Sequence, residues 1–149
     1  MSDSKTKRDE RPRVGVSLLV VRGDEFLAGL RLGSHGTGEW GTPGGHQELG
    51  ESYEETAARE LEEECGPDLV IARPRFLCVT NLTGYLETSG RHYTDVALVA
   101  NWLSGEPRVM EPKKCQEWRW LKLETIYVNA FGAVPNMQEA FRTGRPYFG

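Results

Sequence analysis

The sequence predicts a single mixed α/β domain in which strands lie on both sides of one well-marked helix. The 149 residues fit one domain of ordinary globular composition, with 38% hydrophobic and 27% charged residues. Apolar, β-branched runs that are typical of strands precede and follow the helical segment, and a second, shorter helix is expected near the C-terminus. This order of elements indicates a layered α/β fold.

The chain begins with a hydrophilic segment followed by a predicted strand pair. Residues 1–11 contain no apolar core segment, so we expect a mobile tail and no signal peptide, and then one domain over residues 12–149. Val14–Val21 and Phe26–Leu32 are apolar and strand-like, and RGDE between them favours a hairpin-like turn. The glycine-rich segment Gly33–Gly45 is expected to be a loop that approaches another group closely.

A helix of about 13 residues after Ser52 is the best-supported element. Ser52 stands at an N-cap position, and Glu55, three residues later, completes a capping box. Gly66 followed by Pro67 is a stop signal, so the helix is expected to end near Cys65.

The second half of the chain is expected to be rich in strands. Strand-like composition marks LVIA (69–72), RFLCVTNL (75–82), YTDVALVANWL (93–103) and EWRWLKL (117–123). Between them we expect a polar turn near LETSGRH (86–92) and a loop over GEPRVMEPKK (105–114). NMQEAFRTG (136–144) predicts the short terminal helix.

The first predicted helix carries an unusual concentration of glutamate. With about 100° between successive residues, Glu60, Glu63 and Glu64 share one face, whereas Glu62 points toward solvent. The neighbouring core stripe consists of Ala57, Ala58, Leu61 and Cys65. Ionised carboxylates beside a packed edge need compensation. Divalent cations, which take oxygen ligands, and a plain solvated acidic face both account for the pattern at this stage.

These residues complete a pattern that resembles the Nudix box. Its fixed positions are occupied by Gly45, Glu51, Arg59, Glu60, Leu61, Glu63, Glu64 and Gly66. The flanking segments GLRLGSHGTGEWGTPGGHQELGES and EPKKCQEWRW resemble the MutT-like branch of nucleoside triphosphate diphosphatases. The resemblance extends over residues 12–149 and implies a Nudix α/β/α sandwich with a mixed β-sheet between helices.

The resemblance also implies a magnesium-dependent enzyme, with manganese as a substitute ion. The implied metal ligands are the Gly44 carbonyl, Glu60, Glu63, Glu64 and a distant acidic residue for which Glu111 and Glu117 are open alternatives. The implied catalytic residues are Glu63, Glu64, Arg59 and Glu51, with Glu63 as ligand or base and the last two forming an orienting ion pair. Without metal, the glutamates should repel one another and raise the pKa of at least one carboxyl group.

The implied reaction is hydrolysis of a nucleoside triphosphate, or a related triphosphate, to a monophosphate and pyrophosphate, for instance in nucleotide-pool sanitising. Expected substrate contacts are Arg31, Gly45, His46, Asn81, Trp118 and Phe131. Each of these residues could instead have only a surface, loop or packing role. Alternation places Trp118 and Trp120 on one strand face, for example, which also suits a core.

Two other functions remain open, namely cleavage of another nucleoside diphosphate linked to X, such as a nucleotide sugar or dinucleotide, and a non-catalytic ligand sensor. The net charge of −4 disfavours nucleic-acid polymers as partners, and no apolar run approaches the roughly 18 residues of a membrane span. Cys65, Cys78 and Cys115 form no disulfide framework, so cytoplasmic residence is expected. Family analogy suggests a homodimer.

Overall fold

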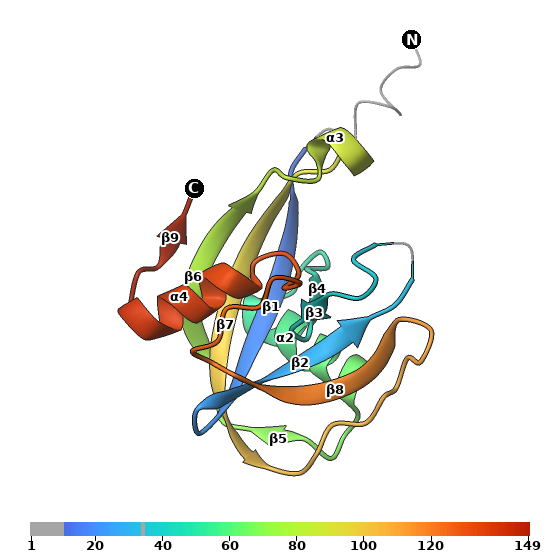
Figure 1. The fold of residues 1–149 in the computed structure, drawn as a ribbon, viewed down its shortest axis with the longest axis vertical. Coiled ribbons are helices and arrows are strands. Elements are labelled where there is room, and N and C mark those ends of the chain that lie inside the picture. Colours follow the sequence, from blue (N-terminus) through green and yellow to red (C-terminus); the bar gives the residue numbers. More distant parts are fainter. Residues whose placement is uncertain (1–10, 34) are drawn as a thin grey trace.

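A mixed β-sheet with a helix against each face forms the frame of the molecule (Figure 1). The structure is a computed structural model that describes residues 11–33 and 35–149. Residues 1–10 of the expected N-terminal tail therefore lie outside the described residues. The α/β/α sandwich expected from the sequence is confirmed. No helix in these described ranges is long and apolar enough to cross a membrane.

The elements follow one another in an order close to the predicted one. The strands are β1 (Arg13–Arg22), β2 (Glu25–Arg31), β3 (Trp40–Gly41), β4 (Gly44–His46), β5 (Val70–Ile71), β6 (Arg75–Leu82), β7 (Tyr93–Ser104), β8 (Cys115–Lys122) and β9 (Tyr147–Phe148). The helices are α2 (Tyr53–Cys65), α3 (Leu86–Ser89) and α4 (Val134–Thr143). The predicted strand pair, central helix and terminal helix are all present.

Four short elements depart from the sequence-based expectation. The segment expected to be only a loop contains β3 and the start of β4, which exist because they pair with β2 and β1. The polar turn near residues 86–92 contains α3, a single helical turn. β9 adds a parallel edge to β6. Each element depends on a partner distant in sequence or is too short to show a period, so local composition does not reveal it.

β1 is the strand from which two wings of the sheet diverge. It runs parallel to β7 along most of its length. Its other edge pairs with β4 at Gly15–Ser17, but with β2 only at Val21 and Arg22. β2 continues away from β1 and pairs with β3 and β8. The opening between β4 and β2 leaves room for a site that both wings line.

Alternation along β1 creates a separate core on each face of the sheet. Val16, Leu18 and Val20 point to one face, where α2 packs through Ala57, Leu61 and Cys65. Leu19 and Val21 point to the other face, where α4 packs through Met137 and Ala140. Ala58 was expected in the core stripe of α2, but it is exposed because it lies beyond the edge of the helix face that contacts the sheet.

The predicted capping box fixes the start of α2. The Ser52 hydroxyl accepts from the Glu55 amide at 3.1 Å, and the Glu55 carboxylate accepts from the Ser52 amide at 2.8 Å. At the other end Gly66 has a φ of 84°, a conformation that other residues rarely adopt, and its amide donates to the Glu62 carbonyl. Both ends of the helix are thereby set by local sequence.

Removal of the cap is expected to destabilise the fold. Ser52→Ala leaves the Glu55 amide without its side-chain acceptor, so the free energy of unfolding should fall by about 1 kcal/mol. Ser52→Asp keeps an acceptor at this position and should remain within about 0.5 kcal/mol of the parent protein. Urea unfolding midpoints measure both effects. Equal midpoints for the Ala and Asp variants would show that the cap contributes nothing.

Candidate active site

Arg59 is the hub of an ion-pair cluster that joins α2 to the preceding loop. Its Nε and Nη2 donate to the two Glu51 carboxylate oxygens at 2.7 and 3.0 Å. Nη2 also donates to the His46 carbonyl at 3.0 Å, and Nη1 donates to Glu60 at 2.8 Å. One guanidinium group therefore links the loop, β4 and the glutamate face of α2.

Glu51 is held as a carboxylate by this cluster. The Arg59 hydrogen bonds lower the pKa of Glu51 to about 2, and the Glu48 amide and Thr56 hydroxyl assist. The same pairing raises the pKa of Arg59. The orienting ion pair that the resemblance implies is therefore present in the structure.

The backbone at Gly44–Gly45 touches the glutamate face of α2 directly. The Gly44 amide donates to the Glu64 carboxylate at 3.0 Å. A Cβ atom on Gly45 would lie 2.4 Å from the Glu60 carboxyl group, and one on Gly44 would lie 2.3 Å from the Val16 carbonyl oxygen. Only glycine fits at either position without a shift of the backbone or of a packed carboxylate.

Two of the three expected glutamates are half-buried, and the third is exposed. Burial raises the pKa of Glu64 to about 8, the nearby Glu60 and Glu111 charges add to this, and the Gly44 amide opposes it. Burial also raises the pKa of Glu60, against the effect of Arg59. The Glu63 side chain is 52% exposed at the rim. A raised carboxyl pKa was expected from mutual repulsion of the glutamates; the pKa values of Glu60 and Glu64 are raised, but burial contributes more than the neighbouring charges.

The carboxylate oxygens suit a hard divalent cation, although they are not gathered around one point. Among the described residues, no three His, Cys, Asp or Glu side chains stand close enough to hold an ion as they are. Arg59 occupies one oxygen of Glu60, and the Gly44 amide occupies one oxygen of Glu64. Burial makes an unpaired carboxylate charge unfavourable. The remaining oxygens of Glu60 and Glu64 are therefore suitable ligands for Mg²⁺, which prefers oxygen.

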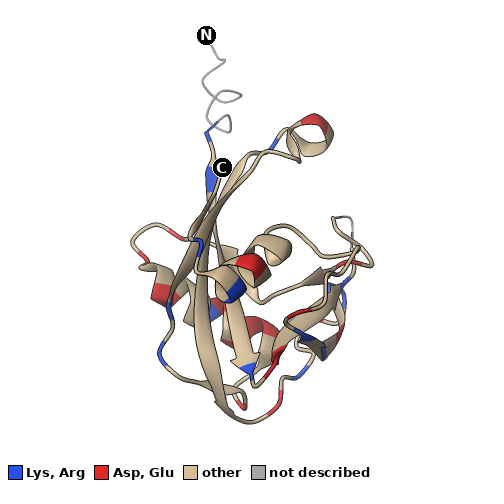
Figure 2. Ribbon diagram, turned by 60° about the vertical axis from the view of Figure 1, so that its left-hand side comes forward, with Lys and Arg blue, Asp and Glu red and all other residues tan. Residues whose placement is uncertain are grey.

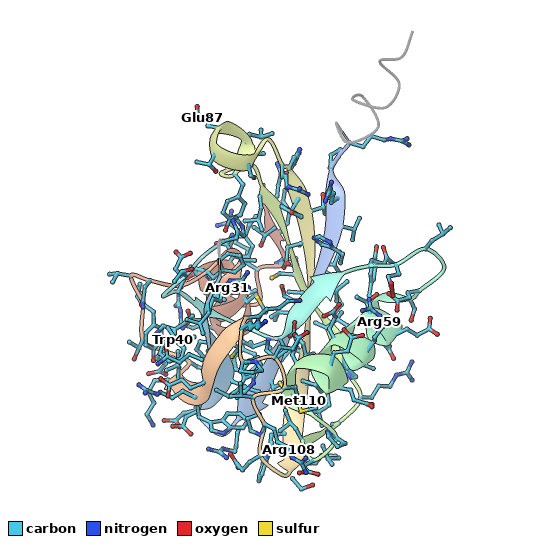
Figure 3. All side chains as sticks on the ribbon, turned by 90° about the vertical axis from the view of Figure 1, so that its right-hand side faces the viewer. Arg31, Trp40, Arg59, Glu87, Arg108 and Met110 are labelled. Carbon is cyan, nitrogen blue, oxygen red and sulfur yellow. The ribbon has the colours of Figure 1, made fainter. Side chains whose placement is uncertain are left out.

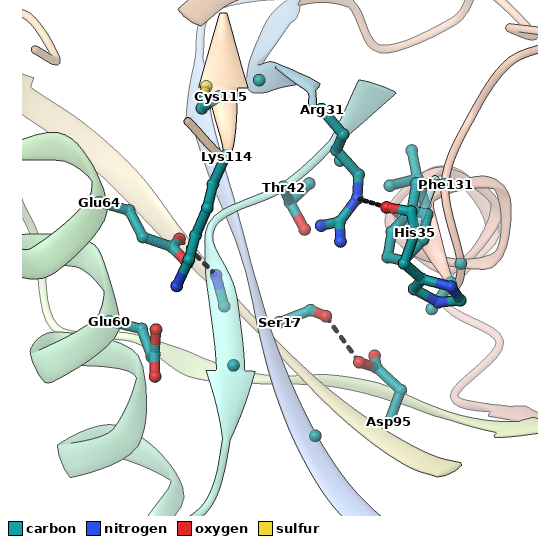
Figure 4. Close-up of a pocket in the computed structure, with 18 of the residues that line it drawn as sticks. Ser17, Arg31, His35, Thr42, Glu60, Glu64, Asp95, Lys114, Cys115 and Phe131 are labelled. Atoms are coloured by element: carbon teal, nitrogen blue, oxygen red, sulfur yellow. Dashed lines mark hydrogen bonds between the residues drawn. The ribbon is translucent and has the colours of Figure 1, made fainter. Parts of the chain in front are cut away.

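These glutamates line one side of a cavity of about 640 Å³ between the two wings of the sheet. The acidic residues recur along α2, where Figure 2 colours them red. Figure 4 shows Glu60 and Glu64 on one side and Arg31, His35 and Phe131 on the other, with Lys114 beside Glu64. A cavity of this size accommodates a nucleotide. It offers carboxylates for metal and cations for phosphate in a single space.

Arg31 is the cationic group of the wall opposite the glutamates. Its guanidinium carbon lies 3.7 Å from the centre of the Phe131 ring, and Nε donates to the His35 carbonyl at 3.3 Å. Burial lowers the pKa of Arg31, which shows that the cation is partly desolvated. Figure 3 shows Arg31 nearer the middle of the molecule than Arg59, which stands at α2.

Aromatic rings continue the wall from Phe131 toward β4. The Tyr85 ring lies 6.2 Å from Phe131, and His46 stacks on Tyr93 at 5.6 Å between ring centres. Burial lowers the pKa of His46, and the Arg13 and Arg91 charges act in the same direction. A neutral His46 ring thus contributes an apolar, stacking surface to the cavity.

The structure brings most of the sequence-predicted residues together. The cavity is lined by Arg31, Gly44, Gly45, His46, Glu60, Glu63, Glu64, Glu111, Trp118 and Phe131. Glu51 and Arg59 support it from behind. Glu117 lies outside the lining and pairs with Arg119 at 2.9 Å. Asn81 also lies outside and is bound to His92.

Several lining residues escaped the sequence reasoning. They are Ser17 on β1, Tyr85 beside α3, Tyr93 and Asp95 on β7, and Lys114 before β8. Asp95 had a usable signal, because it is a carboxylate at the start of the otherwise apolar run VALVA. The others had none, because their place in the cavity depends on how distant elements meet.

Comparisons with known proteins point in one direction. The NUDIX domain family model matches residues 11–143. The structure of a MutT NUDIX hydrolase from Burkholderia pseudomallei aligns with 87% of this chain and 98% of its own, at 32% identity and a TM-score of 0.78. A MutT protein from Methanosarcina mazei Go1 aligns with 91% of this chain and 96% of its own. Its identity of 23% and TM-score of 0.74 establish likeness of fold.

A curated relative is also similar in sequence. The NAD-capped RNA hydrolase NudC of Stutzerimonas stutzeri (strain A1501) is 32% identical over 120 residues, which are 77% of this chain. The chain spans 39% of the length of that relative. The likeness therefore concerns one part of a longer protein.

The raised pKa of Glu64 predicts how the stability of metal-free protein depends on pH. Because the folded pKa of about 8 exceeds the ordinary 4.5, the stabilisation is complete below pH 4.5 and is lost as pH rises through 8. Glu64→Gln should therefore be more stable than the parent at pH 9 by roughly 1–3 kcal/mol, with little difference at pH 4.5. Thermal unfolding in EDTA at both pH values measures this.

Glu62→Gln is the matched control, because Glu62 is exposed on the same helix and lies outside the cavity lining. It should keep the pH dependence of the parent. If Glu64→Gln showed that same dependence, the burial of the Glu64 carboxyl group would have no energetic consequence and the prediction would be wrong.

Proposed function

The chain belongs to the Nudix hydrolase family, and we propose that it is a metal-dependent pyrophosphohydrolase that converts a nucleoside triphosphate, or a related triphosphate, to a monophosphate and pyrophosphate. One observation carries the proposal. A single nucleotide-sized cavity holds the glutamates of α2 on one side and Arg31 with an aromatic wall on the other. The similarity to a MutT NUDIX hydrolase over nearly its whole length supports the same conclusion.

The proposed ion is Mg²⁺, with Mn²⁺ as a substitute. Glu60, Glu64 and the Gly44 carbonyl would hold it, and Glu63 would act as a further ligand or as the proton acceptor. Glu111 is the better candidate for the distant acidic ligand, because it lines the cavity and its charge acts on Glu64, whereas Glu117 is outside. When bound, such ions neutralise polyphosphate charge and lower the pKa of an attacking water.

The protein's own residues supply position and charge. Arg31 and Lys114 would bind phosphate oxygens, and Arg31 is already oriented by its contact with Phe131. Arg59 keeps Glu60 beside the glycine backbone, so its role is to position a ligand. The Phe131 and Tyr85 rings would contact the non-phosphate part of the substrate.

Cleavage of another nucleoside diphosphate linked to X is the second candidate. It is favoured by the curated relative named as an NAD-capped RNA hydrolase, which shares 32% identity with this chain. Product analysis separates the two functions. Pyrophosphate release from a triphosphate supports the first, and two monophosphate-bearing products from a dinucleotide support the second. The non-catalytic sensor gains no support, because every glutamate of the box is retained.

Two broader expectations belong to the same proposal. The three cysteines are all free thiols, which agrees with residence in a reducing cytoplasm. A homodimer stays a prediction from family analogy, and size-exclusion chromatography with light scattering would measure it.

Removal of carboxylates from the glutamate face should abolish the proposed activity. Glu63→Gln and Glu64→Gln each delete a ligand or proton acceptor, so kcat for triphosphate hydrolysis should fall by about 10²–10⁴-fold. EDTA should abolish pyrophosphate release from the parent protein, and Mg²⁺ should restore it. Glu62→Gln, on the solvent side of the same helix, should keep parental activity.

The assay is pyrophosphate release from a panel of triphosphates, with folding checked by circular dichroism. Full activity in both the Glu63 and the Glu64 variants would sink the assignment. Equal losses in the Glu62 control would attribute the effect to helix stability instead of to the site.

A further inference from the structure

Asp95 is a carboxylate inside the cavity that no role assigned so far requires. It lies on β7 and is 7% exposed. One oxygen, Oδ1, accepts a hydrogen bond from the Ser17 hydroxyl at 2.6 Å, as Figure 4 shows. The other oxygen, Oδ2, is fully buried and has no hydrogen-bond partner among the described residues. Asp95 therefore lines the cavity as a carboxylate whose second oxygen is unsatisfied within the described part of the protein.

Burying an acceptor without a hydrogen-bond donor costs free energy. Among the described residues, no neighbouring side chain donates to Oδ2. Burial raises the pKa of Asp95 to about 6, and only the Ser17 hydrogen bond opposes the rise. The group is thus mainly ionised at neutral pH. A buried polar atom left without a partner destabilises the folded protein, so its retention requires a compensating gain. A ligand in the cavity that donates to the carboxylate, once a rotation of the Asp95 side chain turns Oδ2 toward it, would provide that gain.

The position of Asp95 indicates which part of a ligand it would meet. Figure 4 places Asp95 and Ser17 on the side of Arg31, His35 and Phe131, away from Glu60 and Glu64. The cavity lining includes the apolar and aromatic residues Leu82, Tyr85, Tyr93, Phe131, Val134 and Met137, and the Tyr85 ring lies against those of Tyr93 and Phe131. A flat heterocycle suits such a wall. The phosphates would lie nearer the glutamates, so Asp95 faces the edge of the ring system.

We propose that Asp95 is a specificity residue that accepts hydrogen bonds from a ring N–H and an adjacent exocyclic amino group of the substrate. This inference rests on the proposed function, because it deepens the substrate class of the same cavity. The matching edge is that of a 2-amino-4-oxopyrimidine ring, which guanine and pterin rings share. A carboxylate has acceptors only, and two adjacent donors match its two oxygens.

Other bases lack this pair of donors. Adenine and cytosine place an amino donor beside a ring acceptor, and thymine and uracil place one N–H between two acceptors. Each would leave one carboxylate oxygen unpaired or opposed to a lone pair. A site built around a buried polar group rejects analogues that leave it unpaired more strongly than an apolar pocket rejects a change of shape. Ser17 has a positioning role, because it holds Oδ1 and so fixes the carboxylate plane.

The first test compares substrates on the parent protein. We expect kcat/KM for dGTP to exceed that for dITP, which lacks only the 2-amino group, by at least about 10-fold. A pterin triphosphate has the same donor edge. Its kcat/KM relative to that of dGTP shows whether the site prefers a pterin or a guanine ring. A dGTP to dITP ratio near one would overturn the inference without any variant.

The second test changes the acceptor. Asp95→Asn replaces one acceptor by a donor, so kcat/KM for dGTP should fall about 10- to 100-fold. dXTP carries an oxygen in place of the 2-amino group, so its kcat/KM should rise relative to that of dGTP. The variant should also have a higher Tm than the parent at pH 8, because it removes a buried charge. Ser17→Ala should lower the dGTP to dITP ratio, because the carboxylate plane is no longer fixed. Equal losses on dGTP, dITP and dATP in Asp95→Asn would overturn the inference.

A binding measurement separates this inference from the proposed function. Calorimetry in EDTA compares dGMP with dIMP on the parent and on Asp95→Asn, and needs no turnover. Tighter dGMP binding that disappears in the variant supports the inference even if no triphosphate is hydrolysed, in which case the proposed function fails alone. Triphosphate hydrolysis with no difference between dGMP and dIMP means that the inference fails and the proposed function stands.

Discussion

The Gly44–Gly45 backbone lies so close to Glu60 and Glu64 that one added methyl group would overlap a carboxylate or the neighbouring strand. This contact couples the glycine loop, β1 and α2 into one unit, because β4 also pairs with β1 and Arg59 donates to both Glu60 and the His46 carbonyl. The helix cannot rotate or slide without breaking the Gly44 amide contact to Glu64. The glutamate face is therefore fixed relative to the cavity by backbone geometry, and the precision of the site does not depend on flexible side chains.

The two ends of the cavity share an energetic feature. Glu64 at one end and Asp95 at the other have pKa values raised to about 8 and about 6, in both cases mainly through burial. Each carboxylate lowers the stability of the ligand-free protein at neutral or alkaline pH. In the proposed function a bound cation would relieve this cost at the glutamate end, and hydrogen-bond donors of the substrate would relieve it at the Asp95 end. Groups of this kind are common at functional sites, where stability is exchanged for binding and catalysis.

Arg31 and Phe131 line the cavity that holds Glu64 at one end and Asp95 at the other. Arg31 comes from the end of β2, and Phe131 comes from the segment before α4, yet the guanidinium group lies against the ring at 3.7 Å. The contact orients a partly desolvated cation between the aromatic wall and the glutamates. β4 stays paired with β1 while β2 diverges from it, and this creates the space in which the arrangement forms. The topology of the sheet, more than any single residue, makes a substrate-sized cavity available.

The local sequence by itself determined the α2 helix, its capping box, the main strands and the glycine–glutamate spacing, because these depend on neighbours within a few residues or on a helical period. The helical period also placed Glu60 and Glu64 on one helix face, and the resemblance to the Nudix box implied the pairing of Glu51 with Arg59. Only the tertiary structure placed Glu111 in the cavity and Glu117 outside it. Glu111 lies in the loop before β8 and Glu117 lies in β8, and the direction of that strand is set by its pairing with β2. The tertiary structure likewise decided the burial of Asp95 and the pairing of β3 and β4, because burial and strand pairing depend on contacts between residues far apart in the chain.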